Sequence, residues 1–159
     1  MPTPHLLLTG AAGNLGQSVT RQLLDEGYTL HAALGPRDDE HFMTHERLHK
    51  AKANLLDEQA AADFVQQAID TGGVLQGAVL LVGGFAPGTI EKTDGEALEK
   101  MFRLNFLSAY YLVRPLLAHL REQGGGRIVL IGSRPALKAE EGKNVVAYAL
   151  SKSLLFRLA

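Results

Sequence analysis

The chain has 159 residues, 46% of them hydrophobic, which suits one globular unit with a sizeable core. Its formal net charge of −1 excludes a strong field for nucleic acid or an anionic membrane, and the absence of cysteine excludes disulfides, thiolate zinc sites and cysteine nucleophiles. No apolar run approaches the roughly 20 residues that cross a bilayer, and the first residues lack a secretory pattern. We therefore expect a cytoplasmic protein with one domain over residues 1–159.

Segments with strand-like and helix-like patterns alternate along the chain. Short apolar runs predict strands over residues 5–9, 28–34, 50–55, 77–82 and 127–131. Apolar residues at helical spacing predict helices over residues 15–24, 57–70, 94–121 and 145–159. Parallel strands need such helical crossovers, so this order predicts an α/β fold in which a doubly wound parallel sheet lies between two layers of helices.

The last two predicted helices have features of their own. Pro115 predicts a kink within the helix over residues 94–121, and three glycines at 124–126 end that helix. The helix over residues 145–159 keeps an apolar face up to Ala159, with no glycine or proline after it. We therefore expect a fold truncated at its C-terminal end, where a partner or further sequence covers the apolar face.

A glycine-rich turn joins the first predicted strand to the first helix, because residues 9–16 read TGAAGNLG. Glycines allow a tight turn and a close approach of phosphate to the backbone, and the helix N-terminus that follows offers free N–H groups. The pattern predicts a dinucleotide site, although such turns also serve as plain connectors. The residues expected to bind the cofactor here are Gly10, Gly13, Asn14, Leu15 and Gly16.

The end of the second strand bears on the choice between NAD and NADP. A carboxylate there would bind the ribose hydroxyls of NAD, but the chain has Leu34, Gly35 and Pro36. Arg37 follows and would meet the 2′-phosphate of NADP, although the acidic residues at 38–40 weaken that attraction. The expected cofactor is NADP, with NAD as the alternative and a solvated charged loop as the other interpretation of Arg37.

Tyr148 and Lys152 are four residues apart in the last predicted helix, so they share one face. A nearby ammonium stabilises a phenolate, which lets a tyrosine deliver or remove a proton while hydride moves. The spacing predicts a proton-transfer pair, although most such pairs are ordinary solvated side chains.

Further motifs follow in an order that resembles the short-chain dehydrogenase/reductase family over the whole chain. They are the glycine turn, Asn105 within RLNFLS, the GRIV segment at 126–129 that leads to Ser133, and then Tyr148 and Lys152. The resemblance implies an NAD(P)-binding Rossmann fold and an oxidoreductase that acts on a small carbonyl or alcohol substrate. It also implies a homodimer or tetramer formed through the helices over residues 94–121 and 145–159.

The resemblance implies roles for individual residues. Tyr148 is the general acid or base, Ser133 hydrogen-bonds the substrate oxygen, and Lys152 binds the nicotinamide ribose and lowers the tyrosine pKa. Asn105 holds a water in the proton relay, and Asn54 meets the adenine. The remaining cofactor contacts are expected from Leu55, Gly83, Gly84 and Tyr148.

The chain departs from the family pattern at four places. Asn14 stands where non-extended members of the family usually have glycine, so the first turn leans toward the extended, epimerase-like branch. At residues 81–84, LVGG replaces the family's NNAG. That second segment, with Phe85, is similar to the aromatic turn of the pteridine reductase branch. The stretch between Ser133 and Tyr148 is longer and more charged than usual, and family members continue beyond Ala159. Two alternatives to the carbonyl oxidoreductase stay open: a dinucleotide-binding sensor without turnover, and a pteridine or quinonoid reductase.

A possible zinc motif competes with this interpretation. Residues 45–49 read HERLH, and His41 adds an imidazole one turn earlier. The segment is charged on all sides and lies between two predicted strands, whereas a zinc protease motif needs a buried helix. We therefore predict no metal site, and structural roles for His5, His31 and His119.

Overall fold

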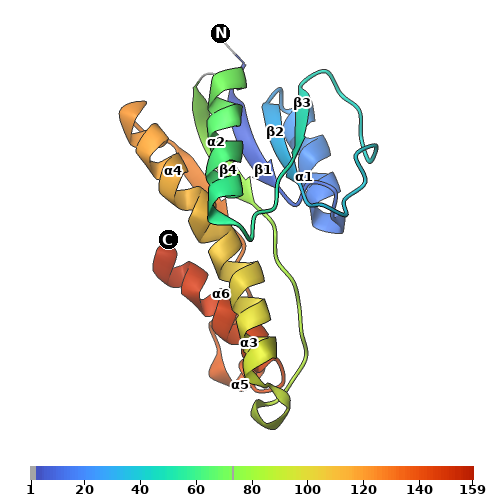
Figure 1. Cartoon of the computed structure of the whole chain (residues 1–159), viewed down its shortest axis with the longest axis vertical. Coiled ribbons are helices and arrows are strands. Elements are labelled where there is room, and N and C mark those ends of the chain that lie inside the picture. Colours follow the sequence, from blue (N-terminus) through green and yellow to red (C-terminus); the bar gives the residue numbers. More distant parts are fainter. Residues whose placement is uncertain (1–2, 73) are drawn as a thin grey trace.

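The computed structural model describes residues 3–72 and 74–159. Five strands form one parallel sheet with the order β3-β2-β1-β4-β5 (Figure 1). The strands are β1 (His5–Thr9), β2 (Thr29–Leu34), β3 (Leu48–Lys52), β4 (Leu75–Leu80) and β5 (Arg127–Leu130). The chain builds outward from β1 to β3 and then returns to add β4 and β5 on the other side. This order confirms the doubly wound sheet, and its direction changes between β1 and β4.

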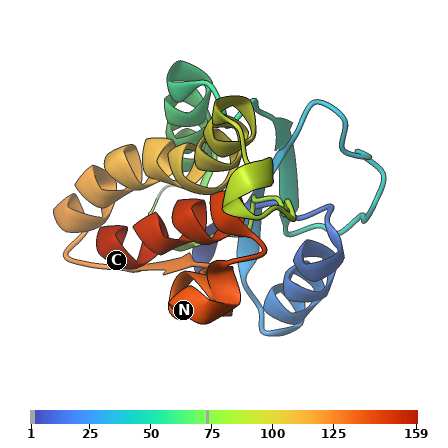
Figure 2. The same cartoon turned by 90° about the horizontal axis from the view of Figure 1, so that it is seen from below.

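Helices cover both faces of the sheet (Figure 2). The helices are α1 (Asn14–Asp25), α2 (Glu58–Gly72), α3 (Gly95–Phe102), α4 (Ser108–Glu122), α5 (Ala139–Gly142) and α6 (Val146–Leu158). Short 3-10 turns occur at Ile90–Lys92 and Arg134–Ala136. The larger core cluster joins one face to α2, α4 and α6 through residues such as Leu7, Val65 and Leu116, while Leu8, Leu24 and Leu30 join the other face to α1. The three-layer arrangement expected from the sequence is confirmed.

Two strands end earlier than predicted because other hydrogen bonds replace the sheet ladder. β3 ends at Lys52, and Asn54 then forms a turn in which its side-chain oxygen accepts a bond from the Leu56 N–H at 3.2 Å. β4 ends at Leu80, because the next two N–H groups, of Leu81 and Val82, donate to Thr9 Oγ1 at 3.1 and 3.3 Å. Both changes occur at the carboxyl ends of the strands, where the chain leaves the sheet.

The helix predicted over residues 94–121 is interrupted. A π-helical segment, Arg103–Leu107, separates α3 from α4, and α4 continues through Pro115 to Glu122. The irregularity therefore precedes the proline by eight residues. It contains Asn105, whose buried side chain bonds the backbone of Gly84, and π-helical turns often mark functional sites.

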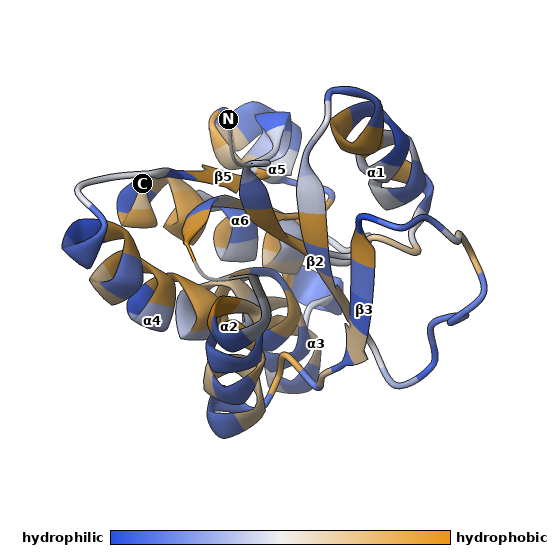
Figure 3. Ribbon diagram, turned by 90° about the horizontal axis from the view of Figure 1, so that it is seen from above, coloured by the Kyte–Doolittle hydropathy of each residue, from blue (hydrophilic) through white to orange (hydrophobic). Residues whose placement is uncertain are grey.

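β5 is an edge strand with one open face. Ile128 and Leu130 pack against the larger core cluster, whereas Val129, on the side of α1, is 45% exposed. Figure 3 shows hydrophobic colouring along β5 and on α6. In the part of the chain that the structure describes, no helix has the length and apolar character needed to cross a membrane.

Candidate functional site

The glycine turn lies at the carboxyl end of β1, and its close packing explains why glycine is needed there. Gly10 has φ of 70°, which favours glycine. A Cβ on Gly16 would lie 1.8 Å from the carbonyl oxygen of Gly10, so α1 can approach the turn only because this position has no side chain. The first N–H groups of α1, which lack partners within the helix, then begin at this turn. The turn fits a pyrophosphate group.

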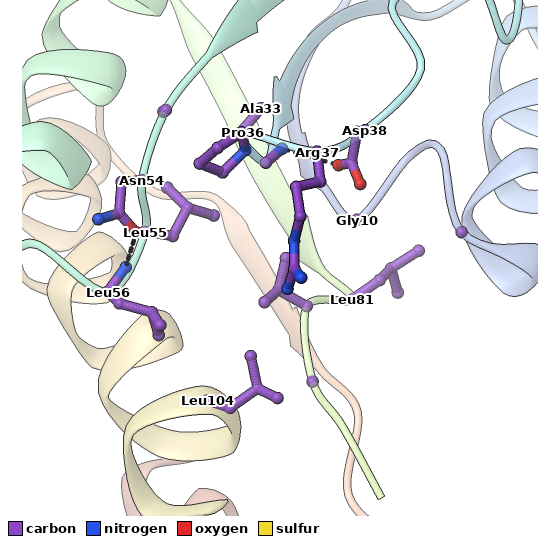
Figure 4. Close-up of a pocket in the computed structure, with 15 residues that line it drawn as sticks. Gly10, Ala33, Pro36, Arg37, Asp38, Asn54, Leu55, Leu56, Leu81 and Leu104 are labelled. Carbon is purple, nitrogen blue, oxygen red and sulfur yellow. Dashed lines mark hydrogen bonds between the residues drawn. The ribbon is translucent and has the colours of Figure 1, made fainter. Parts of the chain in front are cut away.

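A cavity of about 370 Å³ opens beside this turn, between the ends of β1, β2 and β4 (Figure 4). Six of the residues predicted to bind the cofactor line it: Gly10, Gly13, Arg37, Asn54, Leu55 and Gly83. The sequence did not indicate the others, which are Ala33, Gly35, Pro36, Asp38, Ala53, Leu56, Leu81, Val82 and Leu104. Most of these follow the strand ends directly, and the parallel order of the strands is the signal that could have found them.

Six predicted cofactor residues lie outside the cavity lining, and two of them, Tyr148 and Lys152, are described below. Gly16 is buried beneath the turn, Leu15 is 55% exposed, and neither they nor Asn14 and Gly84 line the cavity. Asn14 is the first residue of α1, so its N–H still belongs to the free helix terminus. Leu15 is the second residue of α1, so its N–H belongs to the same free terminus, and its contact with the cofactor stays a prediction.

Asn54 and Arg37 occupy opposite parts of the cavity wall. The Asn54 side-chain oxygen already accepts the Leu56 N–H, which leaves its second lone pair for an adenine amino group. In Figure 4 the Arg37 side chain extends from the end of β2 into the cavity. Among residues 3–72 and 74–159, no carboxylate forms an ion pair with Arg37.

The acidic residues next to Arg37 are engaged with other groups. Asp38 accepts the Gly35 N–H at 2.7 Å, and Asp39 accepts a backbone N–H at 2.8 Å. Glu40 lies 3.4 Å from the ammonium of Lys52. The guanidinium of Arg37 is therefore the available cation of this cavity, although Asp38 also lines it.

Asn105 connects the glycine segment after β4 with α6. Its side chain is almost fully buried, and its Oδ1 accepts the Gly84 N–H at 2.8 Å. Its Nδ2 donates to the Gly84 carbonyl at 3.1 Å and to Ser151 Oγ at 2.9 Å. Ser151 in turn donates to the carbonyl oxygen of Tyr148 at 2.9 Å. This chain of bonds fixes the start of α6 relative to the π-helical segment.

Lys152 lies at the junction of the cavity and α6. It is buried, and its Nζ donates to the carbonyl oxygen of Ile131 at 2.7 Å. Burial lowers the pKa of its ammonium below the ordinary lysine value, because desolvation disfavours the charged form. A Cβ on Gly83, a cavity residue, would lie 3.2 Å from this Nζ and 2.7 Å from Asn105 Oδ1. The ammonium therefore stands next to the cavity wall.

Ser133 and Tyr148 supply the remaining candidate polar groups. Ser133 Oγ is buried, and no group among the described residues hydrogen-bonds it. Such orphaned hydroxyls are rare, so this one has a donor and acceptor available for a bound oxygen. Tyr148 is half-buried on the first turn of α6, and its ring contacts that of Phe85 edge-on with centroids 5.1 Å apart. The sequence indicated Phe85 only through its likeness to the pteridine reductase branch, and it carried no signal for Ser151.

The histidines have positions unlike those of a zinc protease. His41 and His45 lie in the loop before β3, and His49 lies on β3, so HERLH is not helical. Over residues 3–72 and 74–159 no three side chains of the metal-binding types are grouped to hold an ion. His119 is buried, and its Nε2 accepts the Leu75 N–H at 3.1 Å, which is a structural role.

A family model described as short chain dehydrogenase matches residues 4–159. The chain belongs to the short-chain dehydrogenase family. Acetoacetyl-CoA reductase of Acinetobacter sp. (strain RA3849) is 28% identical over an alignment of 155 positions, gaps included, that covers 92% of this chain and 62% of the relative. The 7alpha-hydroxysteroid dehydrogenase of Bacteroides fragilis is 26% identical over an alignment of 163 positions, which covers 96% of this chain and 62% of that protein.

Solved structures of the short-chain dehydrogenase family have the same fold. ElxO with NADP bound superposes with a TM-score of 0.88 at 22% identity, covering 98% of this chain and 65% of that one. A family protein from Francisella tularensis has a TM-score of 0.80 at 26% identity and covers 98% and 61%. The chain thus spans less than two thirds of the length of each of these four proteins.

Proposed function

We propose that residues 1–159 form an NAD(P)-binding Rossmann domain that includes a catalytic Ser133, Tyr148 and Lys152 region. Its reaction is hydride transfer between NADP(H) and a carbonyl or alcohol group of a small organic substrate. The observation that carries the proposal is the position of Gly83, which lines the cavity beside the glycine turn and lies next to Lys152 and Asn105. A reductase and a dehydrogenase among the relatives support the same reaction class.

The proposed chemistry needs two supplies, a hydride and a proton. NADPH held at the glycine turn and by Arg37 would supply the hydride for the new C–H bond at the carbonyl carbon. Ser133 donates a hydrogen bond to the substrate oxygen from its free hydroxyl, and the Tyr148 hydroxyl gives that oxygen a proton as it becomes an alcohol. Lys152 stabilises the resulting phenolate with its charge. Asn105 keeps its side chain committed to Gly84 and Ser151, so its role in this proposal is to position both segments.

Tyr148→Phe tests the chemistry. We expect turnover of carbonyl substrates to fall by roughly 10²- to 10⁴-fold, because the proton donor is lost, while the affinity for NADPH changes only a few-fold. The assay follows NADPH absorbance with a panel of ketones and aldehydes. Tyr110→Phe is the matched control, since Tyr110 is 40% exposed on α4. Turnover by Tyr148→Phe close to that of the parent would remove Tyr148 from the mechanism.

The proposed cofactor is NADP, on the basis of Arg37 in the cavity and of Gly35 and Pro36, which follow β2 where a ribose-binding acid would be expected. Asp38, which also lines the cavity, accepts the Gly35 N–H. We expect NADPH to bind more tightly than NADH, and Arg37→Ala to weaken NADPH binding by about tenfold, as for the loss of one charged phosphate contact. NADH affinity in the same variant is the control. A parent that prefers NADH contradicts this cofactor choice.

The alternatives predict different outcomes of the same assays. A binding module without turnover binds NADPH equally before and after Tyr148→Phe, and reduces nothing in the panel. A pteridine or quinonoid reductase reduces a dihydropteridine or quinone added to that panel in preference to simple ketones. Phe85 beside Tyr148 is the observation that favours this second candidate.

We also propose that the chain forms a homo-oligomer through α3, α4 and α6. Between α3 and α6 lies a mostly apolar groove, lined by Leu98, Phe102, Leu150 and Leu154 among others. Leu150 is 53% exposed and Leu98 is 41% exposed, so the groove presents apolar surface that a second copy covers. Light scattering tests this: Leu150→Arg converts the assembly to a monomer, and a monomeric parent at micromolar concentration contradicts the proposal.

A further inference from the structure

The segment that carries Phe85 is fixed at both ends by backbone hydrogen bonds. At one end, the N–H and carbonyl of Gly84 both bond the side chain of Asn105. At the other end, the Gly88 N–H donates to the Asn144 carbonyl at 2.8 Å, and the Gly88 carbonyl accepts the Val146 N–H at 2.9 Å. The segment between the two glycines is therefore held against the beginning of α6 and cannot simply turn away.

The two positions before Phe85 are glycines with close neighbours. A Cβ on Gly83 would meet Asn105 and Lys152, and a Cβ on Gly84 would lie 2.4 Å from Leu104 Cδ2. Phe85 is therefore the first side chain to project after the cavity wall at Gly83. Its ring contacts the Tyr148 ring edge-on, with centroids 5.1 Å apart.

Phe85 keeps most of its surface in water although its backbone is fixed. It is 65% exposed, and the edge-on contact with Tyr148, at 68° between the ring planes, uses only a small part of its surface. Single exposed apolar side chains are common and need no explanation by themselves. What distinguishes Phe85 is its contact with the ring of the proposed proton donor, on a segment that holds it there.

We propose that Phe85 determines substrate specificity, by selecting carbonyl compounds that carry a flat, conjugated group next to the carbonyl carbon. This inference rests on the proposed function, which places the substrate oxygen at Tyr148 and Ser133. A flat group attached to that carbonyl packs on Phe85 in an offset or edge-on arrangement, which adds to ordinary apolar burial. A saturated ring of the same size lacks that additional interaction.

A matched pair of ketones tests the proposal. Acetophenone and cyclohexyl methyl ketone share one skeleton and differ in whether the ring is aromatic. We expect Phe85→Leu to lower kcat/KM for acetophenone, relative to the cyclohexyl ketone, by roughly three- to tenfold, as expected for one lost aromatic pair. The change in the ratio is the readout, because it cancels the different intrinsic reactivities of the two ketones. Ile90→Ala is the control: Ile90 is 67% exposed and follows Phe85 by five residues, and its ratio stays at the parent value.

A binding measurement makes the test independent of turnover. With NADP in its oxidised form neither ketone can be reduced, so ligand-observed NMR gives the affinity of each for the cofactor complex. Phe85→Leu lowers the preference for acetophenone here as well. If the parent is active and Phe85→Leu leaves the ratio of the two kcat/KM values unchanged, the proposed role of Phe85 is wrong and the proposed function stands. Failure of both ketones to bind the cofactor complex also contradicts the role of Phe85. If the parent protein does not bind NADPH in a separate cofactor titration, the proposed function itself is contradicted.

Discussion

At Gly83 the backbone leaves space that two side chains from distant segments occupy. A methyl group there would lie 2.7 Å from Asn105 Oδ1 and 3.2 Å from Lys152 Nζ. The first distance is shorter than any normal contact, and Asn105 cannot move without breaking its bonds to Gly84 and Ser151. The identity of this residue is therefore fixed by the packing of the candidate site.

Gly83→Ala should weaken NADPH binding and carbonyl turnover by at least tenfold, because the ammonium and carboxamide must shift. Titration with NADPH and the absorbance assay measure both effects. Gly95→Ala is the control, since a Cβ at Gly95, in the first turn of α3, meets nothing within 4 Å. That change should stabilise the protein by about 0.4–1 kcal/mol, because it restricts the unfolded chain. Parent-like cofactor binding by Gly83→Ala would show that the site tolerates the displacement.

Local spacing in the sequence predicted some residues of the candidate site, and others could not be predicted because their roles depend on long-range contacts. Tyr148 and Lys152 follow from a four-residue interval on one helix, and the glycine turn follows from its own sequence. Ser151 lies between them, but its significance comes from Asn105, which is 46 residues away. Phe85 likewise gains its position from Tyr148. A sequence without the fold gives neither contact.

At the level of elements, α6 is held against the π-helical segment by one buried pair of polar side chains. Ser151 and Ser153 both donate to the carbonyl three residues earlier, at 2.9 and 2.7 Å. Only Ser151, which is 2% exposed, also accepts a bond from Asn105. Comparing substitutions at the two serines therefore distinguishes the effect of the bond to Asn105 from that of the bond within α6.

Ser151→Ala should lower the free energy of unfolding by about 1–3 kcal/mol, because it leaves the buried Asn105 Nδ2 without one of its two oxygen acceptors. Ser153→Ala should change it by no more than about 0.5 kcal/mol, because Ser153 is only half-buried and its side-chain bond lies within the helix. Urea unfolding monitored by circular dichroism measures both. Equal effects of the two substitutions would mean that the Asn105 bond contributes nothing to the packing of α6.

The type and order of the elements were predictable, and their ends were less so. Apolar periodicity predicted each strand of the sheet and the main helices. The predicted strand over residues 50–55 ends three residues too late, because the Asn54 turn sets the end of β3 at Lys52. The helix predicted over residues 94–121 contains a π-helical segment. Both deviations depend on side chains bonding to backbone, for which apolar periodicity carries no signal.

On the scale of the whole molecule, three histidines form a row across neighbouring strands at the amino end of the sheet. The ring centroids of His5 and His31 are 5.3 Å apart, and those of His31 and His49 are 5.1 Å apart. His5 Nδ1 lies 3.0 Å from His31 Nε2. Burial, with added repulsion from His49 and His5, lowers the pKa of His31 to about 4. The folded chain therefore keeps this imidazole neutral when an unfolded chain would protonate it.

We expect the free energy of unfolding to fall as the pH decreases from 6.5 to 4. In that range the unfolded chain binds a proton at His31 that the folded chain does not, and above pH 6.5 neither does, so the loss is confined to this window. Its size is at most about 3 kcal/mol. Urea unfolding at several pH values measures it, with His31→Phe flattening the slope and the exposed His41→Phe leaving it unchanged. Equal slopes for the parent and His31→Phe would exclude His31 as the cause.

The parallel direction of all five strands separates this histidine row from the candidate site, which lies at the opposite end of the same strands. Loss of stability in acid and loss of catalysis in acid therefore originate at opposite ends of the sheet. If activity declines in weak acid and the decline moves with His31→Phe, the protein is losing its fold. If the decline is unaffected by that substitution, it reports protonation at the candidate site. The pH of the assay buffer can then be chosen for catalysis without regard to the stability of the fold.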